Sequence, residues 1–127
     1  MFADDSQQNI QQLLRSLGAT ENYTGFAHTA YAVQLTIAEP ERLCLITKRL
    51  YPDVAKRFGT NWKAVERNIR TVVSVIWSNN APMLLEMAGF PLASKPNNAC
   101  FLAILANACT SGEFEMNADS RELVGDT

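Results

Sequence analysis

The middle of the chain carries a hydrophobic pattern that predicts a short helix. Apolar residues recur there at helical spacing and form an inward-facing side: Val54, Ala55 and Phe58. Pro52 suits the first turn, because the N–H that proline lacks would have no partner there. Gly59 is typical of a helix end, where the backbone turns left-handed. We therefore expect a short helix that ends at Gly59.

A longer helix is predicted directly after it, with Thr60 and Asn61 able to cap its start. At about 100° per residue, one side of this helix is entirely apolar: Val65, Ile69, Val72, Val73 and Ile76. That side must pack on the rest of the domain. Together the two helices predict a helix-turn-helix motif over residues 52–77.

The opposite side of the longer helix is polar and mostly basic. It carries Lys63, Glu66, Arg67, Arg70 and Ser74. An arginine can bind guanine in the major groove through two parallel hydrogen bonds, and a glutamate can accept from cytosine N4. The pattern also fits an ordinary solvated helix surface, on which Glu66 and Arg70 pair because they lie four residues apart. The residues alone leave both interpretations open.

Further helices are predicted on both sides of the motif. Before it, the spacing of apolar residues indicates helices over 7–17, 24–38 and 42–50. After it we expect a turn at 78–80, a short helix over 81–87, an extended connector over 91–96, and a last helix from Asn97 or Asn98 to about Cys109. The last helix is apolar on nearly every side, so it is central to the core or lies at an interface. The sequence thus predicts one all-α domain of about six helices over residues 1–109.

The end of the chain differs in composition. Residues 110–127 include five acidic residues and few large apolar ones. Such a segment buries too little apolar surface to fold by itself, so we expect a mostly disordered acidic tail.

Composition excludes several classes of protein. The 127 residues suffice for one domain with its own core, and a hydrophobic content of 47% excludes general disorder. The start of the chain lacks the basic and apolar segments of a signal peptide. No apolar run approaches the roughly 20 residues of a membrane span. We expect a cytoplasmic protein without membrane contact.

Neither a catalytic site nor a metal site is expected. The three cysteines, Cys44, Cys100 and Cys109, lack metal-binding spacing and are expected to be small core residues in a reducing compartment. The one histidine, His28, has no partner in a ligand motif and is expected at the surface. The sequence shows no nucleophile–base pair and no phosphate-binding loop, so we expect neither an enzyme nor a cofactor.

Charge is unevenly distributed along the chain. Between Lys48 and Arg70 there are seven basic and two acidic residues, a net charge of +5, against four basic and eleven acidic residues elsewhere, a net charge of −7. A basic patch on an acidic body is a plausible DNA-facing surface. Lys48 and Arg49 end one predicted helix close to where a phosphate backbone would pass.

A family resemblance centres on residues 50–77, LYPDVAKRFGTNWKAVERNIRTVVSVIW. The combination of Leu50-Tyr51-Pro52-Asp53 with Val65-Glu66-Arg67 is specific, and the likeness extends over roughly residues 6–109. This region resembles the DNA-binding effector domain of the sporulation master response regulator of spore-forming Firmicutes.

The resemblance implies a sequence-specific DNA-binding transcriptional regulator. In the family, the longer helix of the motif binds a short duplex box, and the domain also touches the RNA polymerase sigma factor. We expect contacts to the DNA bases from Lys63, Glu66, Arg67 and Arg70, and contacts to phosphates from Lys48, Arg49, Lys56, Thr60, Asn61 and Thr71. Double-stranded DNA is therefore the expected partner.

The chain also departs from the family pattern. Ala64 stands where the family usually has an arginine, and Thr71 where it usually has a histidine, so the preferred DNA sequence is expected to differ. The receiver domain that controls dimerisation in the family is missing from the sequence, so we expect a monomer off DNA. The alternative function is a protein–protein interaction module that keeps the fold but has lost specific DNA binding.

Overall fold

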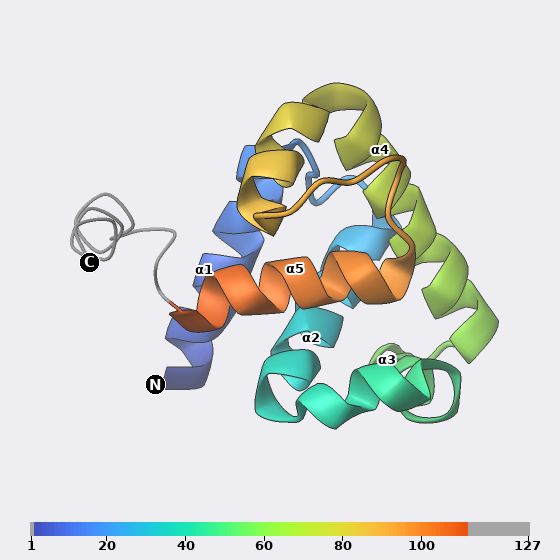
Figure 1. Cartoon of the computed structure of the whole chain (residues 1–127). Coiled ribbons are helices and arrows are strands. Elements are labelled where there is room, and N and C mark those ends of the chain that lie inside the picture. Colours follow the sequence, from blue (N-terminus) through green and yellow to red (C-terminus); the bar gives the residue numbers. More distant parts are fainter. Residues whose placement is uncertain (1, 112–127) are drawn as a thin grey trace.

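Helices make up the fold of residues 2–111, the part of the chain that the computed structural model describes (Figure 1). The elements in chain order are α1 (Phe2–Leu17), α2 (Thr24–Ala38), the 3₁₀ segment η1 (Pro40–Leu45), the π segment η2 (Ile46–Leu50), α3 (Tyr51–Phe58), α4 (Trp62–Ala88) and α5 (Asn98–Ser111). No strand occurs among these residues, which confirms the expected all-α class. None of the helices within 2–111 is long and apolar enough to cross a membrane. Of the predicted acidic tail, residues 112–127 lie outside the described part.

The core forms where α5 crosses the bundle. In Figure 1, α5 runs across the front, with α2 behind it, α1 on one side and α4 on the other. On the inner side of α5, three side chains are fully buried: Phe101, Leu102 and Leu105. α2 contacts α1, α3, α4 and α5, so it links the helices from within. The apolar last helix was expected either in the core or at an interface, and it lies in the core.

α4 is longer than predicted because it continues across a bend. The expected turn at 78–80 is a single non-helical residue, Asn80 (φ −152°, ψ 38°), with helix on both sides of it. Pro82 follows the bend; proline lacks an N–H, and its ring disfavours regular helix in the preceding turn. The Asn80 side-chain amide donates to the backbone oxygen of Ser16 (3.1 Å), which ties the bend to the end of α1. Gly89 ends the helix in the left-handed conformation (φ 75°).

The predicted helix over 42–50 is wrong in type. The chain forms a 3₁₀ segment and then a π segment, separated at Leu45 (φ −125°, ψ 48°). Leu45 is 44% exposed. The connection between α2 and α3 is short, and both helices are packed against α4. The non-helical backbone of Leu45 lies between these packed helices, so the segment is not one regular helix.

Three further expectations need correction. α1 begins at Phe2, five residues before the predicted start at residue 7. Cys44 is exposed on η1 and is not a core residue, whereas Cys100 and Cys109 are half-buried and pack against the core. Phe58 is 39% exposed. As the last residue of α3 it lies at the rim of the core, where its ring packs edge-on against Tyr31 (5.9 Å between centroids).

His28, expected at the surface, is buried at the junction of three helices. It belongs to α2 and is 5% exposed. Its ring lies 5.0 Å from that of Phe58 on α3, and the Asn68 amide on α4 donates to its Nδ1 at 3.4 Å. Burial lowers the pKa of His28 below its ordinary value, because it disfavours the charged imidazolium. Helical periodicity did not reveal this position, because the burial comes from α3 and α4.

The closest crossing of α2 and α4 depends on Gly25. A Cβ atom added at Gly25 would lie 2.2 Å from the backbone oxygen of Asn68 and 2.8 Å from a methyl group of Val72. Only a residue without a side chain allows α4 to approach α2 so closely. Ala55, on α3, is buried as expected. Gly25 has no counterpart in the sequence prediction, because the contact that requires it comes from α4.

Replacing Gly25 with alanine is expected to destabilise the fold. The new methyl group would meet the α4 backbone, so the two helices would have to move apart, at a cost of about 1–3 kcal/mol in the free energy of unfolding. Urea denaturation measures this loss. Gly89→Ala is the matched control: nothing lies near its added Cβ, and only its positive φ opposes the change, at about 1 kcal/mol. A Gly25→Ala protein as stable as the parent would contradict the close crossing.

The stability of the domain is expected to fall below neutral pH through His28. The folded state holds the pKa of His28 below its unfolded value of about 6.5, so the unfolded chain binds the proton first. Its contribution is complete above pH ~6.5 and is lost as the pH falls through the lower folded-state pKa. The measurement is urea unfolding from pH 7.5 down to pH 5.5. His28→Gln, which does not titrate, should flatten this dependence, since His28 is the one histidine of the sequence; an unchanged slope in that variant contradicts the assignment.

Candidate nucleic-acid interface

α3 and α4 form the predicted helix-turn-helix. α3 ends at Gly59, whose left-handed backbone (φ 66°, ψ 37°) lets the chain turn, and Thr60 N donates to the carbonyl of Ala55 (2.9 Å). Asn61 caps α4, because its side-chain oxygen accepts from Ala64 N at 2.9 Å. Val54 and Ala55 are buried beneath α4. The turn and cap therefore follow the sequence prediction.

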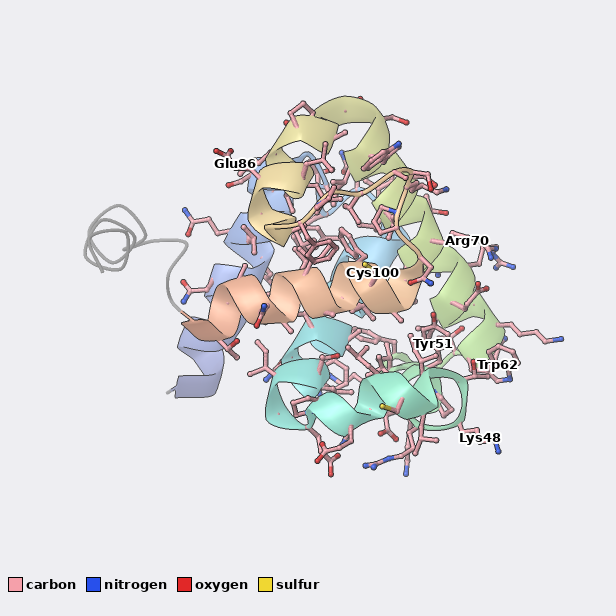
Figure 2. The ribbon with its side chains drawn as sticks, in the orientation of Figure 1. Lys48, Tyr51, Trp62, Arg70, Glu86 and Cys100 are labelled. Atoms are coloured by element: carbon pink, nitrogen blue, oxygen red, sulfur yellow. The ribbon has the colours of Figure 1, made fainter. Side chains whose placement is uncertain are left out.

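The outer side of α4 carries the predicted base-contacting residues. Val65, Ile69, Val72, Val73 and Ile76 are all buried, so the side opposite to them faces away from the domain. Lys63, Arg67 and Arg70 are exposed there, and Figure 2 shows Arg70 extending outward from α4. Arg67 lies at the centre of this outer face by helical periodicity. The structure therefore brings the three cations together on one surface.

Glu66 lies at the edge of the same face and is paired. Its carboxylate accepts from Arg70 Nη1 at 2.7 Å, with side-chain exposures of 32% for Glu66 and 54% for Arg70. The pairing that the spacing allowed is thus present in the protein without DNA. Exposed pairs of this kind contribute about 0.3–0.5 kcal/mol, so the pair is weak enough to exchange for DNA contacts.

Most of the residues expected to contact phosphates are exposed around the motif. Lys48 lies on η2, Lys56 on α3, and Thr60 in the turn, all with exposed side chains. Thr71 is exposed on α4, where its hydroxyl donates to the backbone oxygen of Arg67 (3.1 Å). Among the described residues, no acidic side chain pairs with Lys48 or Lys56. Both ammonium groups are therefore available to an anion.

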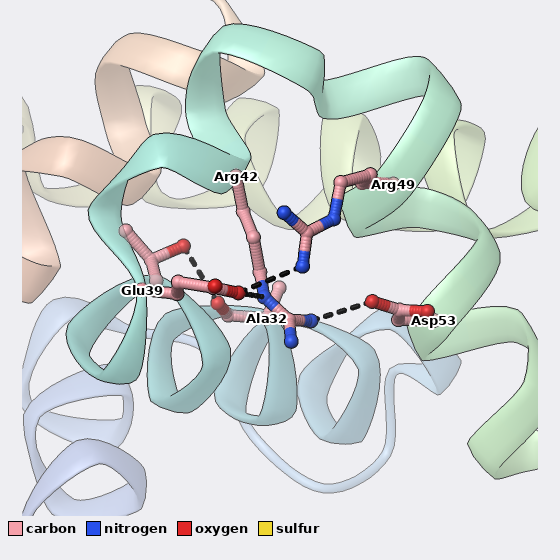
Figure 3. Close-up of polar contacts among 6 residues, drawn as sticks. Ala32, Glu39, Arg42, Arg49 and Asp53 are labelled. Carbon is pink, nitrogen blue, oxygen red and sulfur yellow. Dashed lines mark hydrogen bonds and ion pairs between the residues drawn. The ribbon is translucent and has the colours of Figure 1, made fainter.

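Arg49 is placed differently from the other expected phosphate contacts. It pairs with Glu39 at 2.8 Å, within a cluster that also holds Arg42 and Asp53 (Figure 3). Arg42 donates to Glu39 (2.9 Å) and to Asp53 (2.6 Å), so it joins the end of α2 to the first turn of α3. The pKa of Glu39 lies below its ordinary value, first because of the hydrogen bond from Arg42 and then because of the charge of Arg49. The cluster holds η1 and η2 in place and occupies the Arg49 guanidinium.

A hollow of about 510 Å³ lies beside the turn of α4 that carries Glu66 and Arg70. Arg70 lines it together with Lys95, a cation of the connector before α5 that is not among the predicted site residues. Lys95 is exposed, and its ammonium group donates to Ser74 Oγ on α4 at 2.9 Å. Local spacing gave no signal for Lys95, because it reaches the interface only through the fold.

Another unpredicted residue is Trp62, the first residue of α4. Trp62 is 39% exposed directly after the turn of the motif, and Lys63 Nζ lies 5.8 Å from the centroid of its ring. The surface around the motif is therefore basic and aromatic. No group of histidine, cysteine and acidic side chains suited to a metal ion occurs within residues 2–111.

Beneath the hollow, a buried polar contact joins the helices. The Asn98 amide donates to Tyr51 Oη and to the backbone oxygen of Glu66, each at 3.0 Å. Burial raises the pKa of Tyr51 above its ordinary value, and the hydrogen bond from Asn98 opposes part of this rise. Tyr51 is therefore a neutral phenol at physiological pH.

Comparison with known families agrees with this geometry. Residues 10–109 match the family described as sporulation initiation factor Spo0A C terminal. The match spans α2, α3, α4 and most of α5, including the whole helix-turn-helix. It also confirms the resemblance inferred from residues 50–77. The chain therefore belongs to the family of Spo0A C-terminal domains, which are DNA-binding effector domains in transcription regulation.

Proposed function

We propose that this protein binds double-stranded DNA sequence-specifically through the outer face of α4 and regulates transcription. The observation that supports this most directly is the exposed position of Lys63, Arg67 and Arg70, opposite the buried side of α4. α4 protrudes with α3 at one edge of the molecule, as Figure 1 shows. In a helix-turn-helix, the second helix enters the major groove by such a face.

Each side chain on this face has a role that fits its chemistry. Arg67, at the centre, forks onto the O6 and N7 acceptors of a guanine. Glu66 accepts from a cytosine N4 amine, and Arg70 then exchanges its carboxylate partner for DNA at the groove wall. Lys63 adds a point charge at the start of the helix.

Phosphate contacts orient the domain on the duplex. Lys48, Lys56, Thr60, Asn61 and Thr71 surround the base-contacting face, and Lys95 adds a cation beside Arg70. Asn61 keeps its side chain on the helix cap and so contributes mainly through its position in the turn. Arg49 contributes only if it leaves Glu39. The net attraction is moderate, since the chain as a whole carries a charge of −2.

The preferred DNA sequence is expected to differ from that of typical family members. Ala64 has no group that reaches a base, and Thr71 already donates to the helix backbone. Lys63 can replace the positive charge of the arginine that the family usually has at position 64, but it lacks the two-point geometry of an arginine. In the same proposal the protein acts in the cytoplasm without enzymatic activity and contacts the RNA polymerase sigma factor. Titration with purified sigma factor tests that contact.

Arg67→Ala and Lys56→Ala should separate base reading from charge attraction. If Arg67 forks onto a guanine, its loss costs about 1–3 kcal/mol on the preferred duplex and much less on a scrambled one. Lys56 lies on α3, where a side chain meets phosphate, so its loss should weaken both duplexes by a similar factor and lower the salt slope by about one unit. Titrations of both variants against both duplexes at two salt concentrations measure these losses of affinity and the salt slope.

The alternative function gives a different outcome. If the two variants behave alike on both duplexes, α4 is not reading bases. The protein would then be a non-specific DNA binder, and a protein–protein interaction module would explain the fold better.

The protein is expected to be a monomer in dilute solution without DNA. The helix with the most apolar surface, α5, buries Phe101, Leu102, Ile104 and Leu105 within its own domain, so this surface is not available to a second copy. Sedimentation velocity at several concentrations tests the expectation. A stable dimer without DNA would contradict it and would locate an interface outside the core side of α5.

A further inference from the structure

Asn98 is a buried polar side chain at the point where three helices meet. It is the first residue of α5 and is 8% exposed. Its amide donates to Tyr51 Oη, at the start of α3, and to the backbone oxygen of Glu66, in the second turn of α4. A carboxamide NH₂ group has two N–H donors, which is the number these two acceptors require.

Asn98 is not needed to start its own helix. The neighbouring Asn97 does this, because its side-chain oxygen accepts from Cys100 N at 2.8 Å. The two asparagines therefore have different roles: Asn97 caps α5, and Asn98 makes contacts between helices. An unpaired amide in this position would be unfavourable, so both bonds are expected to persist.

The acceptor on α4 belongs to the base-contacting turn itself. The Glu66 carbonyl is part of the same turn as the Glu66 and Arg67 side chains. A bond from α5 to this carbonyl fixes how far α4 extends and how it is rotated relative to the core. The second bond fixes Tyr51, so both halves of the helix-turn-helix are held by one side chain.

We propose that Asn98 is a positioning residue for sequence reading, which holds the base-contacting turn of α4 and the start of α3 in a fixed relation. The inference rests on the proposed function and adds a residue that lies behind the interface. Base contacts require side chains to be placed within about 0.5 Å. Attraction to phosphates tolerates larger shifts, because it depends on charge more than on orientation.

The test is Asn98→Leu, a variant of similar size that cannot donate. The quantity measured is the ratio of affinities for the preferred and the scrambled duplex, well below the thermal midpoint of each protein. Loss of the bond to the Glu66 carbonyl should lower this ratio about five- to tenfold, as expected for one hydrogen bond, with affinity for the scrambled duplex unchanged. If Asn98→Leu fails to fold, Asn98→Ser takes its place, because serine suits the first turn of a helix but is too short to reach Glu66.

Two controls separate positioning from general stability. Ile104→Ala removes buried surface from the same helix without touching a polar contact, so it should lower stability and leave the ratio unchanged. Tyr51→Phe removes one acceptor and keeps the bond to Glu66, so its ratio should stay close to that of the parent.

The outcomes are distinct. The inference is overturned if a folded Asn98 variant keeps the affinity ratio of the parent. It is also overturned if Ile104→Ala lowers this ratio as much as the Asn98 variant does. A parent protein that does not prefer any duplex overturns the proposed function, and the role of Asn98 falls with it. A reduced ratio in the Asn98 variant alone supports the positioning role.

Discussion

Burial of one side of α4 is the constraint on which the rest of the structure depends. Five valine and isoleucine side chains are removed from water along that side, and at about 1.5–3 kcal/mol each they contribute roughly 7–15 kcal/mol as an upper estimate. The Glu66–Arg70 pair on the other side contributes about 0.3–0.5 kcal/mol. The core therefore sets the rotation of α4, and the charged face is left free to exchange its partners.

Local sequence signals predicted the helix boundaries where a single residue determines the backbone. Gly18, Gly59 and Gly89 all adopt positive φ at the ends of predicted helices. The expectations that were wrong concern contacts between distant segments. His28 is buried by Phe58 and Asn68, from two other helices, and periodicity within α2 carries no trace of them. The break at Leu45 likewise lies in the connection between two helices that both contact α4.

The candidate site divides in the same way. The outer face of α4 follows from helical geometry alone, so its cations were found from the sequence. Arg49 was grouped with them by position along the chain, whereas the fold directs it to Glu39. Lys95 and Asn98 follow their contacts on α4 by many residues in the sequence and reach them only in the folded protein. The exposed cations of the candidate interface were thus more predictable than the residues that support them.

The central claim is that α4 reads a DNA sequence, and selection of bound duplexes from a random pool tests it most directly. The structure predicts enrichment of one short motif, with a guanine at the position facing Arg67 and a cytosine at the position facing Glu66. Bound duplexes with no shared motif, recovered in proportion to their abundance in the pool, would contradict the account.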